Sequence, residues 1–300
     1  MNSQSSMRCP VCENTENFHA LFPRYCKTEN HLCLDCGLVF ITRRTDINAA
    51  YYKRGSYFTK SPNIALRKQM ISRSLLIKYG EKHVTTIVSL LGESPHGKSV
   101  VDVGCAYGET LYVLKRNYNC KVVGIEPSME TSQIGKELFD IRIEPVLLQE
   151  FQGEGFDLVL CSHTLEHVDN PYLFLRRLQQ LMKPSGVLYL EVPNILWPTG
   201  SYSLKKFLYH EHLQNFSAFN LAKLCHKAGL IVANFRDTSF LQFRCQSVGG
   251  ESKAVAEISP VQILSFLERY SKEYGIHDYA KVYGDKLKYL LDLLLRKMWD

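Results

Sequence analysis

The sequence contains no hydrophobic run long enough to cross a membrane. A spanning helix needs about 18 or more consecutive apolar residues, and no such stretch occurs in this chain of 300 residues. The first six residues are polar, so the apolar core of a secretory signal is missing too. These absences lead us to expect a cytoplasmic protein with no membrane partner.

A large excess of charge of one sign is also missing. The net charge is +6 and charged residues make up 22% of the chain, which permits an RNA or anionic-sugar partner without requiring one. Ten cysteines are present, and several lie singly in apolar surroundings, namely Cys120, Cys161, Cys225 and Cys245. Isolated cysteines of this kind indicate buried thiols in a reducing compartment rather than a disulfide framework.

Two Cys-x-x-Cys pairs lie near the start of the chain, well separated in the sequence. Each pair places two thiolates on one tight turn, so the spacing predicts a tetrahedral zinc site with Cys9, Cys12, Cys33 and Cys36 as ligands. The metal would replace the hydrophobic core that so short a segment cannot build. A redox role for either pair is the alternative. We expect residues 1–42 to form a zinc-binding segment.

A glycine-rich turn follows an apolar run in the middle of the chain. Residues 100–103 predict a buried strand, and residues 104–108 then lead into a helical pattern. Such a turn lets the backbone approach a ligand closely and leaves free N–H groups at the start of the helix. Asp102 lies inside the strand, where an acid is unusual unless it holds something in place. An ordinary structural turn is the alternative.

A second apolar run ends in an acid, Glu126. Its spacing from Asp102 is the one that places a carboxylate at the end of the next strand, where it can accept hydrogen bonds from both ribose hydroxyls. A solvated glutamate at a strand end is the alternative. Strand and helix patterns then alternate to about residue 192, which predicts an α/β fold with a doubly wound parallel sheet and a ligand at the carboxyl ends of its strands.

Four motifs in this order resemble those of class I S-adenosylmethionine-dependent methyltransferases. They occupy residues 101–108, 124–127, 156–168 and 181–186, and the resemblance covers about residues 95–245. It implies a Rossmann-like sheet, S-adenosyl-L-methionine as cofactor and methyl transfer as the reaction. A dinucleotide oxidoreductase is the alternative for this fold, but the third glycine of a G-x-G-x-x-G turn is missing.

The same resemblance implies which residues hold the cofactor. The glycine turn would cradle the methionine portion, Glu126 the ribose, and residues 149–150 would border the adenine. The expected cofactor-binding residues are Asp102, Gly104, Cys105, Ala106, Gly108, Glu126, Pro127, Gln149, Ser162 and His163. Ala106 departs from the family pattern, which usually has a glycine there, and alanine makes a positive φ more costly.

Residues 195–217 and the four-cysteine segment are together similar to the zinc-containing C-methyltransferases of deoxyketosugars. In that family a Tyr-x-Glu-His motif supplies the base, and here it matches Tyr209, Glu211 and His212. His212 would take a proton from a hydroxyl, or from a carbon beside a carbonyl. Glu211 would orient or tune His212, and Tyr209 would hydrogen-bond the substrate oxygen. A polar surface segment is the alternative.

The end of the chain departs from the sugar methyltransferases, which continue into a further α/β domain. Here residues 254–299 predict two amphipathic helices, so a sugar-nucleotide substrate cannot be assumed. We expect a helical lid or linker at 43–94, a methyltransferase core at 95–250 and a helical C-terminal extension at 251–300. The oligomeric state is left open.

Three functions remain. The leading one is C- or O-methylation of a small-molecule acceptor, such as a sugar, nucleotide sugar or related metabolite, with a histidine base. The second is an rRNA or tRNA methyltransferase whose zinc segment grips RNA, but the basic residues near the cysteines are scattered rather than clustered: Arg24, Lys27, Arg43 and Arg44. The third is a non-catalytic zinc-binding scaffold, which the intact residues Asp102, Gly104, Gly108 and Glu126 disfavour.

Overall fold

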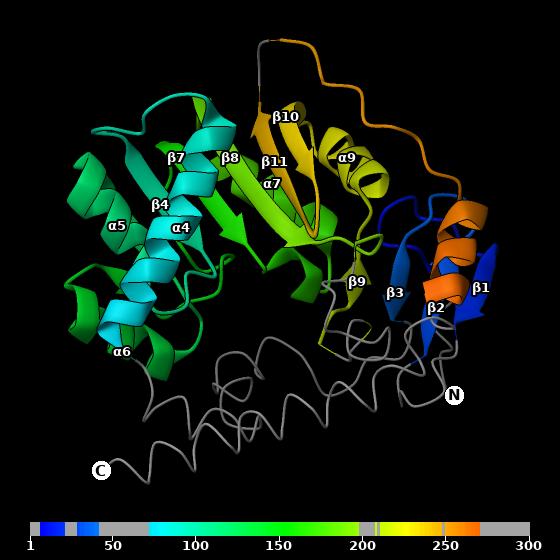
Figure 1. Cartoon of the computed structure of the whole chain (residues 1–300), viewed down its shortest axis with the longest axis horizontal. Coiled ribbons are helices and arrows are strands. Elements are labelled where there is room, and N and C mark those ends of the chain that lie inside the picture. Colours follow the sequence, from blue (N-terminus) through cyan, green and yellow to red (C-terminus); the bar gives the residue numbers. More distant parts are fainter. Residues whose placement is uncertain are drawn as a thin grey trace, which may run out of the picture.

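The computed structural model describes residues 7–21, 29–41, 72–197, 208, 211–247 and 250–270. These residues form two sheets of different size, and helices cover both faces of the larger sheet (Figure 1). The expected helices before residue 72 and after residue 270 lie outside the described residues, as does Tyr209.

The larger sheet has seven strands in the order β10-β11-β8-β7-β4-β5-β6. Neighbours from β8 to β6 run parallel, whereas β11 runs antiparallel to both β8 and β10. The strands are β4 (Ser99–Val103), β5 (Lys121–Ile125), β6 (Ile143–Glu144), β7 (Phe156–Ser162), β8 (Met182–Pro193), β10 (Ile231–Asp237) and β11 (Phe240–Gln246). The expected doubly wound α/β sheet is therefore confirmed. Its strand order reverses beside β4, the position where such sheets bind ligands.

Two hydrophobic clusters pack the two faces of this sheet. Helices α4 (Arg73–Leu91), α5 (Glu109–Tyr118) and α6 (Met129–Phe139) supply one face, while α7 (Pro171–Leu181) and α9 (Ala218–Lys227) supply the other (Figure 1). The helix starts follow from their polar capping residues. Ser128, Asn170 and Ser217 each accept a hydrogen bond from a first-turn backbone N–H, which satisfies a donor that the helix itself cannot.

The smaller sheet combines segments from distant parts of the chain. Its four antiparallel strands are β1 (Phe18–Leu21), β2 (Asn30–Cys33), β3 (Val39–Ile41) and β9 (Gln214–Asn215), in that order. A helix at residues 260–270 packs on this sheet through Ile263 and Leu267, which share a buried cluster with Leu32 and Val39 (Figure 1).

Two strands differ from their expected lengths. The pattern at residues 141–148 predicts a full strand, but β6 has only two residues because the next N–H in the ladder, that of Val146, donates to the Glu144 carbonyl instead of to β5. Conversely, the apolar run at residues 187–192 predicts a strand that starts at Val187, but β8 already begins at Met182, and its pairing with β7 shifts register between Phe156 and Leu158.

Among the described helices, none has the length and hydropathy needed to cross a bilayer.

Candidate active site

The glycine turn links β4 to α5 at the centre of the sheet. Gly104 and Gly108 have φ of +79° each, and a Cβ at either position would collide with a neighbour: Thr164 Oγ1 at 2.1 Å for Gly104, and Ile141 Cδ1 at 2.4 Å for Gly108. Ala106 has φ of +47°, so this residue does adopt the costly conformation that its position in the turn predicts. The turn is thus fixed by close packing on both sides.

Glu126 lies at the end of β5 and ties that strand to the turn. Its carboxylate accepts hydrogen bonds from the backbone N–H of Ala106 (3.2 Å) and from that of Ser128 (2.9 Å). The side chain is buried, with the residue 7% exposed. This acid at the end of the second apolar run therefore lies beside the turn, as its spacing from Asp102 predicts.

Three carboxyl groups gather under this turn, and burial disfavours their charged forms. Burial raises the pKa of Asp102 to about 7, with Glu109 and Glu126 adding to the effect. It also raises the pKa of Glu126 to about 7 and increases that of Glu109. A ligand that brings positive charge and hydroxyl donors would favour the ionised forms of these carboxyl groups. S-adenosylmethionine carries an ammonium group, a sulfonium and two ribose hydroxyls, so these residues fit it.

In the segment that follows β7, a buried glutamate lies among histidines. Glu166 belongs to the short helix η1 (Leu165–His167), and its Oε1 lies 3.6 Å from His163 Nδ1 and 3.8 Å from His167 Nε2. Burial opposes ionisation of this carboxyl, but His163, His167 and His212 outweigh it and lower its pKa to about 2. Glu166, His167 and His212 each place one donor atom within 4.8 Å of the others.

A second buried carboxylate holds His163 from the other side. Glu191 on β8 lies 3.1 Å from His163 Nε2, and its Oε2 accepts hydrogen bonds of 2.6 Å from Tyr189 and from Gln242. Desolvation opposes protonation of His163, whose side chain remains 43% exposed, but Glu166 and Glu191 outweigh it and raise its pKa to about 10. His163 is therefore an imidazolium between two carboxylates at neutral pH.

His212 lies next to this charged cluster in a different protonation state. Burial lowers the pKa of His212 to about 4, so its ring is neutral at pH 7 and can accept a proton. Its ring meets that of His167 edge to face, with centroids 5.0 Å apart, and His167 Nδ1 donates to the backbone carbonyl of Glu211 at 2.8 Å. Glu211 is itself buried, with 8% exposed.

The four cysteines expected to bind zinc form one compact cluster. Cys9 and Cys36 have their Sγ atoms 3.5 Å apart, Cys12 and Cys33 have theirs 3.4 Å apart, and the four atoms all lie within 4.8 Å of one another. Zn–S bonds of about 2.3 Å in a tetrahedron separate the sulfur atoms by about 3.8 Å. The cluster therefore has the donor set and the size that a zinc ion requires.

The other residues expected to bind the cofactor lie in different surroundings. The Ser162 hydroxyl is hydrogen-bonded to His83 of α4 at 3.2 Å, and Gln149 is exposed in the loop after β6. The Cys105 thiol is buried against β5, where a Cβ on Gly124 would approach it to 2.4 Å, and it donates to the Ala106 carbonyl at 3.8 Å. Pro127 is half-buried beside Glu126.

Sequence reasoning assigned no role to several residues of the charged cluster, namely Glu166, His167, Glu191 and Gln242. One signal was available for Glu191, because an acid inside an apolar strand run is as unusual as Asp102. For Glu166 the signal was the pair of histidines at positions 163 and 167 that flank it.

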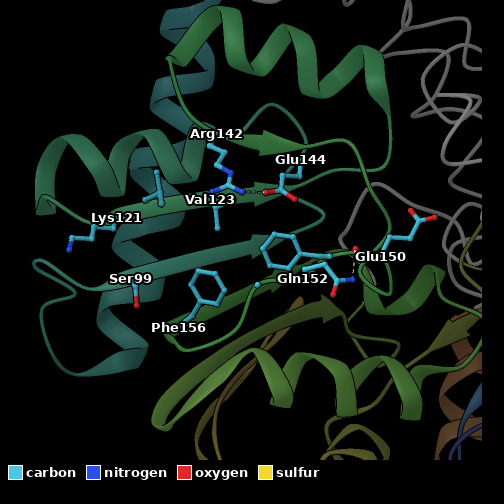
Figure 2. Close-up of a pocket in the computed structure, with 11 residues that line it drawn as sticks. Ser99, Lys121, Val123, Arg142, Glu144, Glu150, Gln152 and Phe156 are labelled. Carbon is cyan, nitrogen blue, oxygen red and sulfur yellow. Dashed lines mark hydrogen bonds and ion pairs between the residues drawn. The ribbon is translucent and has the colours of Figure 1, made fainter.

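An open hollow of about 450 Å³ lies elsewhere on the sheet (Figure 2). Residues 145–155, all of them described, contain no helix to cover this face between β6 and β7. Phe151 and Phe156 stack there with ring centroids 6.3 Å apart, beside the Arg142–Glu144 ion pair. Ser99, Lys121 and Phe156 begin their strands, so the hollow reaches toward the amino ends and away from the glycine turn.

Comparison with known proteins identifies the family. The chain matches a family described as "Methyltransferase domain" over residues 77–233, which is more than half of its length. The chain belongs to this methyltransferase family. It is an S-adenosylmethionine-dependent methyltransferase, and the family's cofactor is S-adenosylmethionine.

Individual relatives resemble this methyltransferase over about half of its chain. The ubiquinone biosynthesis O-methyltransferase of Neisseria meningitidis serogroup C is 28% identical over 170 residues, covering 48% of this chain and 68% of that protein. The mitochondrial enzyme of the same name from Rattus norvegicus is 26% identical over 174 residues, covering 48% and 50%. The solved structure of mitomycin 7-O-methyltransferase shares the fold, with a TM-score of 0.50 at 20% identity, covering 64% of this chain and 60% of that one.

Proposed function

We propose that this methyltransferase methylates a carbon or oxygen atom of a small-molecule acceptor, with His212 as the general base. The observation that carries the proposal is the position of His212, which places a ring nitrogen within 4.8 Å of a Glu166 carboxylate oxygen, and burial lowers the pKa of this ring so that it is neutral at pH 7. The pair lies next to the glycine turn, because Thr164 of the same loop donates to the Val103 carbonyl at 3.3 Å.

In the proposed reaction each residue of the candidate site has its own role. Bound S-adenosylmethionine supplies an electrophilic methyl group. His212 accepts the acceptor's proton on a ring nitrogen, which leaves the acceptor atom nucleophilic. Glu166 stabilises the imidazolium that forms on His212. His163, whose two ring nitrogens face Glu166 and Glu191, keeps these two carboxylates ionised. Tyr209 and Glu211 keep the roles that the motif implies, in hydrogen-bonding the acceptor and orienting the base.

The cofactor would be held by the turn and the strand ends around it. In this proposal the turn at Gly104, Ala106 and Gly108 lets the backbone approach the cofactor closely, although the N–H groups of these residues already donate within the protein. Asp102 and Glu126 present carboxylates, and burial raises the pKa of both acids to about 7. The supporting residues are Cys105, Pro127, Gln149, Ser162 and His163.

We also propose that the four-cysteine cluster binds one Zn²⁺ as a structural ion. Its support is the donor set of four free thiols in one tetrahedron-sized cluster. Metal analysis of the purified protein should find about one zinc per chain, the content of a single four-cysteine site. A fully folded sample without metal would overturn this assignment.

Two resemblances support a small-molecule acceptor. The matched relatives are named as O-methyltransferases of ubiquinone biosynthesis, and residues 195–217 resemble the deoxyketosugar C-methyltransferases. The first favours an oxygen atom and the second favours a carbon atom.

A methyl-transfer screen tests the proposal. The protein, loaded with methyl-labelled S-adenosylmethionine, would be offered deoxyketosugar nucleotides, free sugars, phenols, tRNA and rRNA in parallel. We expect label in one class of small molecule, and nuclear magnetic resonance of the product then distinguishes a C-methyl from an O-methyl group. Label in RNA alone would overturn the small-molecule proposal, and failure to bind the cofactor in calorimetry would overturn the cofactor site.

A further inference from the structure

The segment that carries His212 is built into the same sheet as the cysteine cluster. Strand β9 begins two residues after His212 and pairs with β3, with Asn215 opposite Val39 and Gln214 opposite Phe40. The backbone N–H of Ile41 donates to the carbonyl of Leu213 at 3.0 Å, which extends this ladder to the residue next to His212. We call residues 7–41, which hold the cysteines and strands β1 to β3, the ribbon.

The β2–β3 hairpin that pairs with β9 depends directly on the cysteines. Cys33 is the last residue of β2, and its N–H donates to the Leu38 carbonyl at 2.8 Å, while Gly37 N–H donates back to the Cys33 carbonyl at 2.9 Å. The loop of this hairpin is therefore the second Cys-x-x-Cys turn. The ribbon's three strands have only four, four and three residues, a size at which a metal ion usually determines whether such a sheet forms.

Residue Gln214 connects the ribbon to the charged cluster. Its side chain is buried, with 3% of the residue exposed, and its Nε2 donates to the Val168 carbonyl at 3.0 Å, directly after η1. From the other direction, His167 of η1 donates to the Glu211 carbonyl at 2.8 Å. These two hydrogen bonds lie on either side of His212 and fix it against η1.

After β9, the chain returns to the larger sheet. The Ile195 N–H donates to the Phe216 carbonyl at 2.9 Å, and Ser217 then caps α9. Residues 211–217 thus lie between the two sheets, with the ribbon holding one end and the methyltransferase core the other (Figure 1).

We propose that the ribbon is a positioning element for catalysis, in which metal at the cysteines fixes β3, and β3 with Gln214 places His212 against η1. The inference rests on the proposed role of His212 as base. It predicts a clear separation of effects, because the glycine turn and Glu126 are connected through β4 and β5 of the larger sheet. Loss of the metal should therefore impair turnover and leave cofactor binding intact.

The first experiment removes the metal from the full-length protein with a chelator and restores it with zinc, alongside Cys36→Ser and the matched control Cys120→Ser. Cys120 is buried outside the cluster, with its thiol on the Pro95 carbonyl. In the metal-free and Cys36→Ser proteins we expect faster hydrogen exchange at residues 211–217. We also expect a loss of kcat of up to about 100-fold, the cost that a misplacement of about 1 Å can carry, and an unchanged Kd for S-adenosylhomocysteine. Unchanged exchange and unchanged kcat would overturn the proposal.

A second variant covers the case in which the metal-free protein unfolds as a whole. Gln214→Ala leaves the cysteines in place, and Gln180→Ala on the exposed surface of α7 is its control. We expect Gln214→Ala to keep its metal content and cofactor affinity while kcat falls about tenfold, the effect of losing one buried hydrogen bond. A kcat equal to that of Gln180→Ala would overturn the proposal.

The outcomes also separate this inference from the base assignment. If His212→Ala turned over at the wild-type rate, the base would be wrong, and hydrogen exchange at residues 211–217 would still report whether the ribbon holds the segment. If His212→Ala is inactive and metal removal changes neither exchange nor kcat, the base stands and the ribbon has no positioning role.

Discussion

The cofactor half and the acceptor half of the candidate site are assembled in different ways. The cofactor half comes from one strand, its turn and the end of the next strand, so that Asp102, the glycines and Glu126 share one continuous stretch of sequence. The acceptor half brings together η1, β8 and residues 211–212, and its last part is anchored to the ribbon at the start of the chain. A contiguous motif can be recognised by its spacing, whereas an assembly of distant segments cannot.

The two halves also differ in charge. In the cofactor half, burial raises the pKa of Asp102 and of Glu126 to about 7, because no cation among the described residues offsets the desolvation there. In the acceptor half, the neighbouring histidines overcome the same burial and lower the pKa of Glu166 and of Glu191 to about 2. The acceptor half carries its own cation, and the cofactor half is suited to receive one.

The largest expected effect comes from replacing the proposed base, which should lower turnover without changing cofactor binding. His212→Ala should lower kcat by at least about 100-fold, the usual contribution of a general base. Its Kd for S-adenosylmethionine should stay unchanged, because His212 is not part of the turn. Steady-state kinetics and calorimetry measure the two quantities, with exposed His96→Ala as the control. Wild-type turnover in His212→Ala would remove this residue from the mechanism.

The second largest effect is the converse, a loss of cofactor affinity with little change in turnover. Glu126→Ala should weaken cofactor binding by roughly 10- to 100-fold, the equivalent of about 1.5–3 kcal/mol for a hydrogen bond to a charged group. At saturating cofactor, kcat should change little, because the acceptor half remains intact. Glu137→Ala, on the exposed surface of α6, is the matched control. Equal affinities in the two variants would show that the ribose does not bind at Glu126.

A third effect tests the difference in charge. Below pH 7 both Asp102 and Glu126 are largely protonated in the cofactor-free protein, since each pKa is about 7, and a cation binds the ionised forms better. Binding must therefore release protons at low pH. Affinity for S-adenosylmethionine should rise with pH between about 6 and 8, by at most about tenfold per unit for each carboxyl, and then level off.

Calorimetry across this pH range, with S-adenosylhomocysteine as the matched ligand, provides the measurement. The homocysteine product lacks the sulfonium charge, so its affinity should depend less steeply on pH. Identical slopes for the two ligands would show that the carboxyls respond to the ribose and the ammonium group alone.

The cofactor half could be predicted from the sequence to a greater extent than the acceptor half. The alternation of apolar runs and helical patterns predicts the parallel sheet, and the spacing of Asp102 and Glu126 predicts an acid beside the turn, because both depend on local periodicity. The pairing of β9 with β3 could not be predicted, since so short a strand carries no periodic signal and most of the methyltransferase core separates it from its partner in the sequence. The charges of His163 and Glu166 depend on their approach to each other and on the burial of Glu166, which only the folded chain defines.

The smallest expected effect concerns the turn itself. Ala106 has φ of +47°, a conformation that costs an L-residue about 1–2 kcal/mol, whereas glycine adopts it freely at a cost of about 0.5–1 kcal/mol in chain entropy. Ala106→Gly should therefore raise the free energy of unfolding by no more than about 1 kcal/mol and leave cofactor affinity nearly unchanged. Denaturant unfolding and calorimetry measure both.

Asn119→Gly is the matched control, because Asn119 has φ of +51° at the end of α5, outside the turn. Both variants place glycine in a similar backbone conformation, but asparagine tolerates this conformation better than alanine, so Asn119→Gly should raise the free energy of unfolding less than Ala106→Gly. A loss of cofactor affinity in Ala106→Gly that Asn119→Gly does not share would show that the methyl group of Ala106 contacts the cofactor. The cofactor half would then owe its selectivity to a side chain as well as to the shape of its backbone, and would resemble the acceptor half more closely than its contiguous sequence implies.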